Sequence, residues 1–106
     1  MPKYLVKASH TREGLRGLMN EGGTARRAAI SAGITALGGT METFLYAFGD
    51  DDLYVILDVP EQTTMAAIAL TSGAGGAGTV STTVLLTPEE IDQAVQKSFK
   101  YQPPRP

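Results

Sequence analysis

The sequence lacks cysteine and tryptophan and contains a single histidine, His10. Without cysteine the chain can form neither disulfide bonds nor thiolate metal sites, and it has no thiol nucleophile. Neither sign of charge is in large excess, because 9 Lys and Arg stand against 11 Asp and Glu, which gives a formal net charge of -2. That balance lacks the basic surface expected of a nucleic-acid-binding protein, so we expect no nucleic-acid partner.

Long hydrophobic runs are missing as well. No apolar stretch approaches the roughly 20 residues of a membrane span, and the first three residues lead into a strand-like segment rather than a signal peptide. We therefore expect a cytoplasmic protein without membrane contact. The length of 106 residues, of which 42% are apolar, fits one globular domain over residues 1–106.

Hydrophobic periodicity divides the chain into alternating strands and helices. Paired glycines separate two early helical segments at Gly22-Gly23 and end the second at Gly38-Gly39. Near the C-terminus, Thr87-Pro88-Glu89-Glu90 predicts a capped helix that buries Ile91 and Val95. The proline-rich residues 101–106 are expected to be extended. The predicted elements are a strand at 3–8, helices at 12–19 and 24–37, strands at 40–48 and 53–59, a helix at 61–71, a strand at 79–86 and a helix at 88–98.

This order is β-α-β-β-α-β with one appended helix, which predicts an α+β, ferredoxin-like domain with a four-stranded antiparallel sheet and two helices on one face. Both faces of the predicted hairpin strands are apolar, although helices can cover only one face. We expect another copy of the chain to cover the second face, in a homodimer or a higher even-numbered oligomer. In the predicted strand 53–59, one face carries Leu53, Val55, Leu57 and Val59, and the other carries Tyr54 and Ile56. In the predicted strand 40–48, one face carries Phe44, Tyr46 and Phe48, and the other carries Met41, Leu45 and Ala47.

Several stretches of the chain resemble the GYD domain family, small bacterial and archaeal proteins of the dimeric α+β barrel superfamily. The resemblance implies that two sheets pair face to face in a dimer, and it implies no activity, because none is established for the family as a whole. The family's Gly-Tyr-Asp signature reads Gly49-Asp50-Asp51 here, so any role of its tyrosine is absent. The stretches are Glu13-Gly14-Leu15, Glu21 to Arg27, Leu37-Gly38-Gly39, Tyr46 to Asp50 and Thr82 to Glu90.

One strand carries a candidate binding surface, because Glu42, Phe44, Tyr46 and Phe48 alternate along it. A lone carboxylate beside three aromatic rings can line a small ligand pocket, and core packing is the alternative that we favour. His10 is a candidate general base without any partner spacing, and a surface histidine is its plain alternative. The catalytic candidates are His10, Glu42 and Tyr46.

Three other motifs carry weaker signals. Arg26-Arg27 lies near a predicted helix start and is a candidate for binding an anionic ligand group, with a solvated or salt-bridged pair as the alternative. Asp50-Asp51-Asp52 offers oxygen ligands for Mg²⁺ or Ca²⁺ but lacks the calcium-loop spacing, so we favour a solvated turn. Gly73 to Gly78 matches G-x-G-x-x-G, but a helix precedes it and a strand follows, the reverse of a dinucleotide site. We expect no cofactor and no metal.

Three classes of function remain. In the first, the chain is a homo-oligomeric module that binds a small organic ligand between its sheets. The ligand-binding candidates are then Phe44, Phe48, Arg26 and Arg27. Alternatively, it is a cofactor-free oxygenase or isomerase, by analogy with enzymes on such barrels. A regulatory ligand sensor is the weakest reading, because no DNA-binding segment is visible.

Overall fold

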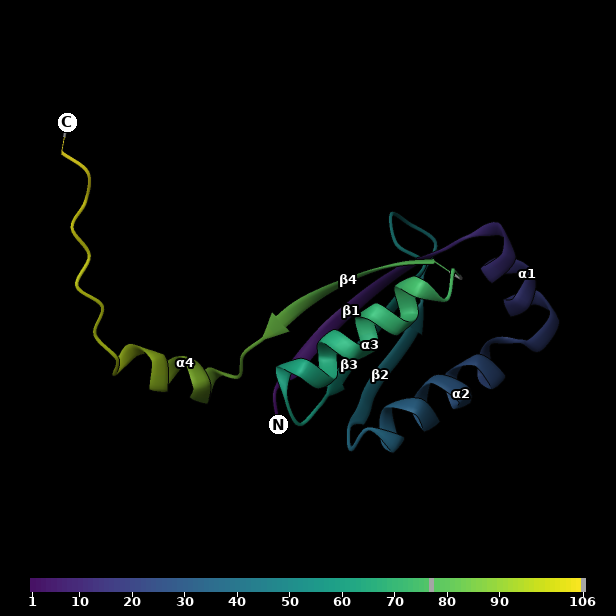
Figure 1. The fold of residues 1–106 in the computed structure, drawn as a ribbon, viewed down its shortest axis with the longest axis horizontal. Coiled ribbons are helices and arrows are strands. Elements are labelled where there is room, and N and C mark those ends of the chain that lie inside the picture. Colours follow the sequence, from purple (N-terminus) through teal and green to yellow (C-terminus); the bar gives the residue numbers. More distant parts are fainter. Residues whose placement is uncertain (77, 106) are drawn as a thin grey trace.

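The computed structural model describes residues 1–76 and 78–105 of the chain (Figure 1). Four strands form one sheet in the order β2-β3-β1-β4, and every neighbouring pair is antiparallel. This arrangement confirms the predicted α+β, ferredoxin-like fold. The strands are β1 (Lys3–His10), β2 (Thr40–Tyr46), β3 (Leu53–Asp58) and β4 (Gly78–Leu85).

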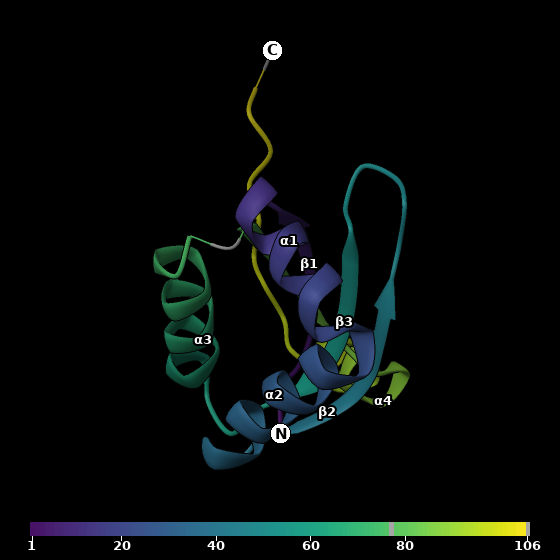
Figure 2. The same ribbon diagram turned by 90° about the vertical axis from the view of Figure 1, so that its right-hand side faces the viewer.

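Three helices, α1 (Arg12–Glu21), α2 (Gly23–Ala36) and α3 (Gln62–Ala74), lie on one side of the sheet (Figure 2). The Thr11 side chain caps α1 by accepting a hydrogen bond from the Gly14 amide at 3.1 Å. Gly38 follows α2 with a φ of 81°, a left-handed conformation that glycine adopts without steric cost. Helix α2 packs on β2, and α3 packs on β4.

The core lies between the central strands and these helices. Alternate residues of β1 and β3 point toward the helices and are buried, as the sequence predicts for β3. Ile34 of α2 and Met65 of α3 pack against them. The buried apolar residues are Tyr4, Val6, Ile34, Leu53, Val55, Leu57, Val59 and Met65.

A register shift in β2 corrects the predicted faces of that strand. The shift lies between Met41 and Thr43, so Met41 pairs with Leu57 on the helix side rather than lying opposite Phe44. An extra residue in one strand inverts the alternation beyond it, and no feature of the alternating sequence marks its place. β2 also ends at Tyr46, so Phe48 lies outside the strand and is fully exposed.

The last helix, α4 (Pro88–Val95), corrects a second prediction. Its capping box is confirmed, because the Thr87 hydroxyl accepts from the Glu90 amide at 3.1 Å and the Glu90 carboxylate accepts from the Thr87 amide at 2.9 Å. The predicted burial of Ile91 and Val95 is wrong for the single chain, since they are 47% and 73% exposed. α4 and the segment after it project away from the sheet (Figure 1), so no other described element covers Ile91 and Val95.

The projecting segment also determines the overall dimensions. The radius of gyration is 17.1 Å, against about 13 Å for a compact chain of this length. Within the described residues, no helix is long and apolar enough to cross a membrane.

Candidate functional site

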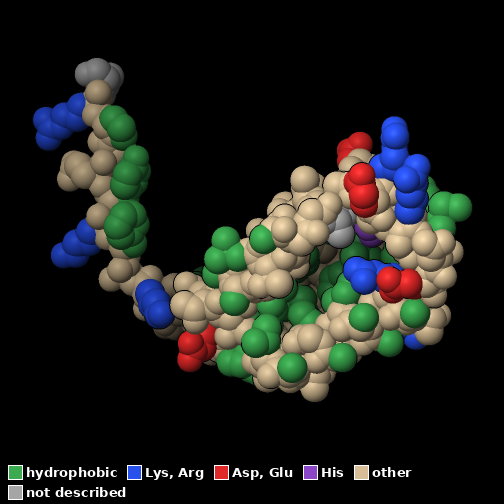
Figure 3. All heavy atoms as spheres, turned by 45° about the vertical axis from the view of Figure 1, so that its right-hand side comes forward, with side chains coloured by type: hydrophobic (Ala, Val, Ile, Leu, Met, Phe, Trp, Pro, Cys, Tyr) green, Lys and Arg blue, Asp and Glu red, His purple; other side chains and the backbone are tan. Residues whose placement is uncertain are grey.

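A cavity of about 300 Å³ lies between the sheet and helices α2 and α3. Figure 3 shows its opening as a hollow with hydrophobic side chains inside and charged side chains beside one end. Because α2 rests on β2 and α3 rests on β4, the two helices leave a gap over the middle of the sheet. Small side chains, including Ala8 and Val80, line the strands beneath this gap and do not fill it.

Most of the cavity wall is apolar. Ile30 and Ile34 of α2 face Ile68 of α3 across it, and Phe44 and Leu57 belong to the sheet. Phe44 makes an edge-to-face contact with Tyr46, with ring centroids 5.3 Å apart. Such a wall suits an apolar ligand.

Tyr46 joins the wall to the start of α2. Its hydroxyl donates a hydrogen bond to the Gly23 carbonyl oxygen at 3.0 Å. A Cβ on residue 23 would lie 2.9 Å from the Tyr46 ring, so a larger residue here would require the ring to shift. The Tyr46 hydroxyl is thus already engaged by the protein, and the residue lines the cavity as a packed ring.

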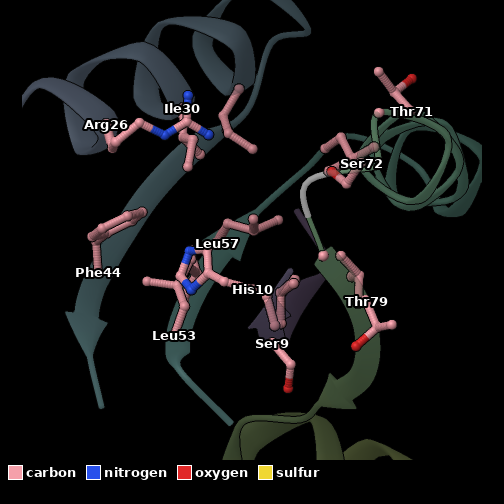
Figure 4. A pocket seen from close by; sticks show the side chains of 18 of the residues that line it. Ser9, His10, Arg26, Ile30, Phe44, Leu53, Leu57, Thr71, Ser72 and Thr79 are labelled. Carbon is pink, nitrogen blue, oxygen red and sulfur yellow. The ribbon is translucent and has the colours of Figure 1, made fainter. Parts of the chain in front are cut away.

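Polar groups gather at one end of the cavity, where His10 ends β1 and Arg26 reaches in from α2 (Figure 4). A smaller hollow of about 200 Å³ adjoins this end and shares His10, Arg26 and Gly75 with the cavity. Glu13 and Glu21 of α1 line the smaller hollow, and Glu21 lies 3.9 Å from the Arg26 guanidinium. The Arg26 guanidinium therefore shares this end of the cavity with two carboxylates, of which Glu21 is close to it.

His10 is fixed by Asp52, which directly precedes β3. The His10 amide donates to Asp52 Oδ2 at 2.8 Å, and the imidazole Nδ1 lies 3.7 Å from the same oxygen, too far for a hydrogen bond. Nδ1 is buried and has no hydrogen-bond partner among the described residues. Asp52 is itself held by its amide, which donates to the Ala8 carbonyl, and by its carbonyl, which accepts from Ala47, both at 2.8 Å.

The structure brings together part of the predicted site. His10, Tyr46, Phe44 and Arg26 line the cavity. Phe48 and Arg27 are exposed and do not line it.

Glu42 lies away from the cavity because of the register shift in β2. Its carboxylate pairs instead with the Lys3 ammonium, which also hydrogen-bonds Asp58 at 3.1 Å. These two hydrogen bonds, to Glu42 first and Asp58 second, raise the pKa of Lys3 above its usual 10.5. Glu42 is therefore a structural partner of β1 rather than a pocket carboxylate.

Asp52 is the residue that sequence reasoning missed. It is the last of three consecutive aspartates, which we interpreted as a solvated turn. In the described part of the chain, no three His, Asp or Glu side chains are placed to hold a metal ion. The β1–β3 register distinguishes Asp52 from its neighbours, because the antiparallel pairing of Ala8 with Leu53 leads to Ser9 opposite Asp52. From there the Asp52 carboxylate reaches the next residue of β1 and accepts from the His10 amide.

Comparison with known proteins agrees with the resemblance seen in the sequence. A family model described as GYD domain matches residues 4–95, from β1 to the end of α4. No curated protein and no solved structure matches the chain. The matched range contains every residue that lines the cavity.

Proposed function

The chain belongs to the GYD domain family, and we propose that it is a homo-oligomeric domain that binds a small organic molecule in the cavity between its sheet and helices α2 and α3. The cavity carries this proposal. At about 300 Å³, it is at the lower end of the roughly 300–1,000 Å³ typical of ligand pockets. Its mostly apolar walls, with His10 and Arg26 at one end, fit a small, mostly apolar ligand with one polar group.

The cavity differs in place from the site that the sequence suggested, which was between the sheets of two copies. It lies on the helix side of the sheet, whereas a second sheet would pack on the opposite, open face. Ligand binding and self-association then use different faces and do not compete. A ligand can enter each copy separately.

The open face supports the homo-oligomeric part of the proposal. Paired strand residues place Leu5 opposite Ile56 and Leu45 opposite Tyr54 on this face, and Leu45 is 61% exposed. An apolar surface of this kind on a small domain is typical of an interface between copies. Exposed apolar side chains of the projecting segment, and Leu86 just before it, add to the apolar surface available to a second copy. Those of the projecting segment are Ile91, Val95, Phe99 and Tyr101.

Indole, a small and mostly apolar molecule, serves as the probe of ligand binding. We expect saturable binding by calorimetry, and we expect Ile68→Trp to weaken it about ten-fold or more because the larger ring fills the cavity. Leu70→Trp on the same helix is the matched control, since Leu70 is 73% exposed and does not line the cavity. Equal binding by both variants would place the site elsewhere and contradict the proposal.

A further inference from the structure

The polar end of the cavity contains a buried nitrogen with an unused hydrogen-bonding position. His10 Nδ1 has no hydrogen-bond partner in the part of the chain that the structure describes, and it lies 3.7 Å from Asp52 Oδ2. Hydrogen bonds between catalytic groups are often long in ligand-free sites and shorten in the complex. The separation of 3.7 Å between Nδ1 and Oδ2 is only slightly longer than a hydrogen bond.

The position of Asp52 determines which ring nitrogen can act on a ligand. Its backbone hydrogen bonds to Ala8 and Ala47 hold the carboxylate beside Nδ1. An ionised carboxylate only accepts hydrogen bonds, so it favours the imidazole tautomer with the proton on Nδ1. Nε2 then carries a free lone pair on a ring that projects into the cavity (Figure 4).

The charged groups near His10 indicate the kind of ligand. Arg26 is the only cationic side chain that lines the cavity in the described part of the chain, and it reaches in from α2. Three carboxylates lie at the same end: Asp52 before β3, and Glu13 and Glu21 on α1. They disfavour a ligand that arrives as an anion, whereas Arg26 can stabilise negative charge that develops on a neutral ligand inside the cavity.

We propose that this end of the cavity is a proton-transfer site for a small neutral molecule with a weakly acidic hydroxyl, a phenol or an enol. The inference rests on the proposed binding of a small molecule in the cavity. The ligand O–H bond breaks and an N–H bond forms at His10 Nε2, which gives an imidazolium beside Asp52 and an oxyanion beside Arg26. No electrons are exchanged, and no co-reactant is needed. Asp52 acts as a positioning residue through His10.

The probe for this step is 4-nitrophenol, because its phenolate absorbs in the visible range and its neutral form does not. The full-length protein is added in excess at a pH where the free probe is mainly neutral. We expect the phenolate fraction to rise about three-fold or more on binding, because Arg26 and the imidazolium stabilise it. His10→Gln should bind the probe without this rise, and Ile68→Trp should not bind it.

Asp52→Asn tests the positioning role, with Asp51→Asn as the matched control, because Asp51 contacts Ser9 and not His10. His10 is the only histidine, so long-range ¹H–¹⁵N spectra give one set of imidazole signals. We expect the Nδ1–H tautomer in the wild-type protein and in Asp51→Asn, and a mixture of tautomers in Asp52→Asn. A wild-type imidazole with its proton on Nε2 would overturn the inference.

The outcomes separate this inference from the function on which it rests. Binding of 4-nitrophenol as the neutral phenol overturns proton transfer and leaves ligand binding intact. Binding of indole without binding of 4-nitrophenol overturns the ligand class. Failure of both probes to bind overturns the proposed function, and the inference fails with it.

Discussion

The two faces of the sheet are built from neighbouring residues and differ in what covers them. Val55 points toward the helices and is 4% exposed, whereas Ile56 points to the open face and is only half-buried. On the helix side, α2 and α3 stand on the outer strands and leave a cavity over the centre. None of the described helices packs on the open side, because α1, α2 and α3 lie on the other side (Figure 2) and α4 projects away from the sheet (Figure 1). The covered face therefore contains a cavity, and the open face is the one that we propose to pair with a second copy.

The two faces also carry their charged groups in different places. On the helix side Arg26 lies at one end of the cavity, whereas Lys3, Glu42 and Asp58 form a cluster at the edge of the open face. Partly exposed ion pairs of this kind stabilise a fold little but discriminate among packing partners. An open face that carries both apolar residues and this charged cluster can therefore pair specifically with the same face of a second copy.

A charge on the helix side should have the largest effect. Val55→Asp places an unpaired carboxylate in the core, and we expect it to lower the free energy of unfolding by about 3 to 5 kcal/mol or to prevent folding. Urea unfolding followed by circular dichroism measures the change. A loss below about 1 kcal/mol would mean that this face is not the core.

The same change one residue later should act on assembly instead. Ile56→Asp on the open face is expected to leave a folded chain and to weaken self-association by roughly 100-fold, because each copy loses roughly 1.5–3 kcal/mol of apolar burial. Light scattering should give a mass of about twice 11.2 kDa for the wild-type protein and 11.2 kDa for the variant. A folded wild-type monomer at micromolar concentration would contradict the proposed assembly.

The projecting segment should contribute less. Val95→Asp removes an apolar side chain of α4 that is 73% exposed in the single chain, and we expect it to weaken self-association about ten-fold by removing part of its contact area. Deletion of residues 103–106 is the control, and it should leave both association and the thermal midpoint nearly unchanged. Unchanged association in Val95→Asp would show that α4 lies outside the interface.

The smallest effect concerns the cluster around Lys3. Because its pKa is raised by Glu42 and Asp58, the ammonium stabilises the fold fully below pH 10.5, and this stabilisation is lost as the pH rises through the higher pKa of the folded state. The difference in urea midpoint between wild type and Lys3→Gln should therefore shrink between pH 7 and strongly alkaline pH. A constant difference would mean that the charge of Lys3 does not matter.

Much of the fold follows from local patterns in the sequence. Alternation in β3 and the capping box of α4 depend on neighbouring residues, and both were predicted. The register shift near Glu42 was not, because a single extra residue in β2 leaves no mark in composition. The direction in which α4 projects was not predicted either. An amphipathic pattern indicates that one face of a helix is apolar, but it does not indicate which chain covers that face.

The site was less predictable for the same reason. His10, Arg26 and Phe44 were candidates by residue type, but their meeting at one cavity depends on the spacing of α2 and α3 over the sheet. Asp52 differs from Asp50 and Asp51 only through the pairing of β1 with β3. Long-range register of this kind is set by the tertiary fold and not by local sequence.

Methyl NMR spectra of the full chain titrated with indole test most directly whether the ligand binds on the helix side of the sheet and not on the open face. Methyl groups of adjacent strand residues report on opposite faces. We predict saturable shifts at the cavity methyl groups of Val6, Ile30 and Ile68, and constant signals from the open-face methyl groups of Leu5, Leu45 and Ile56. Shifts confined to Leu5, Leu45 and Ile56 would contradict the account, because they would place the ligand on the open face.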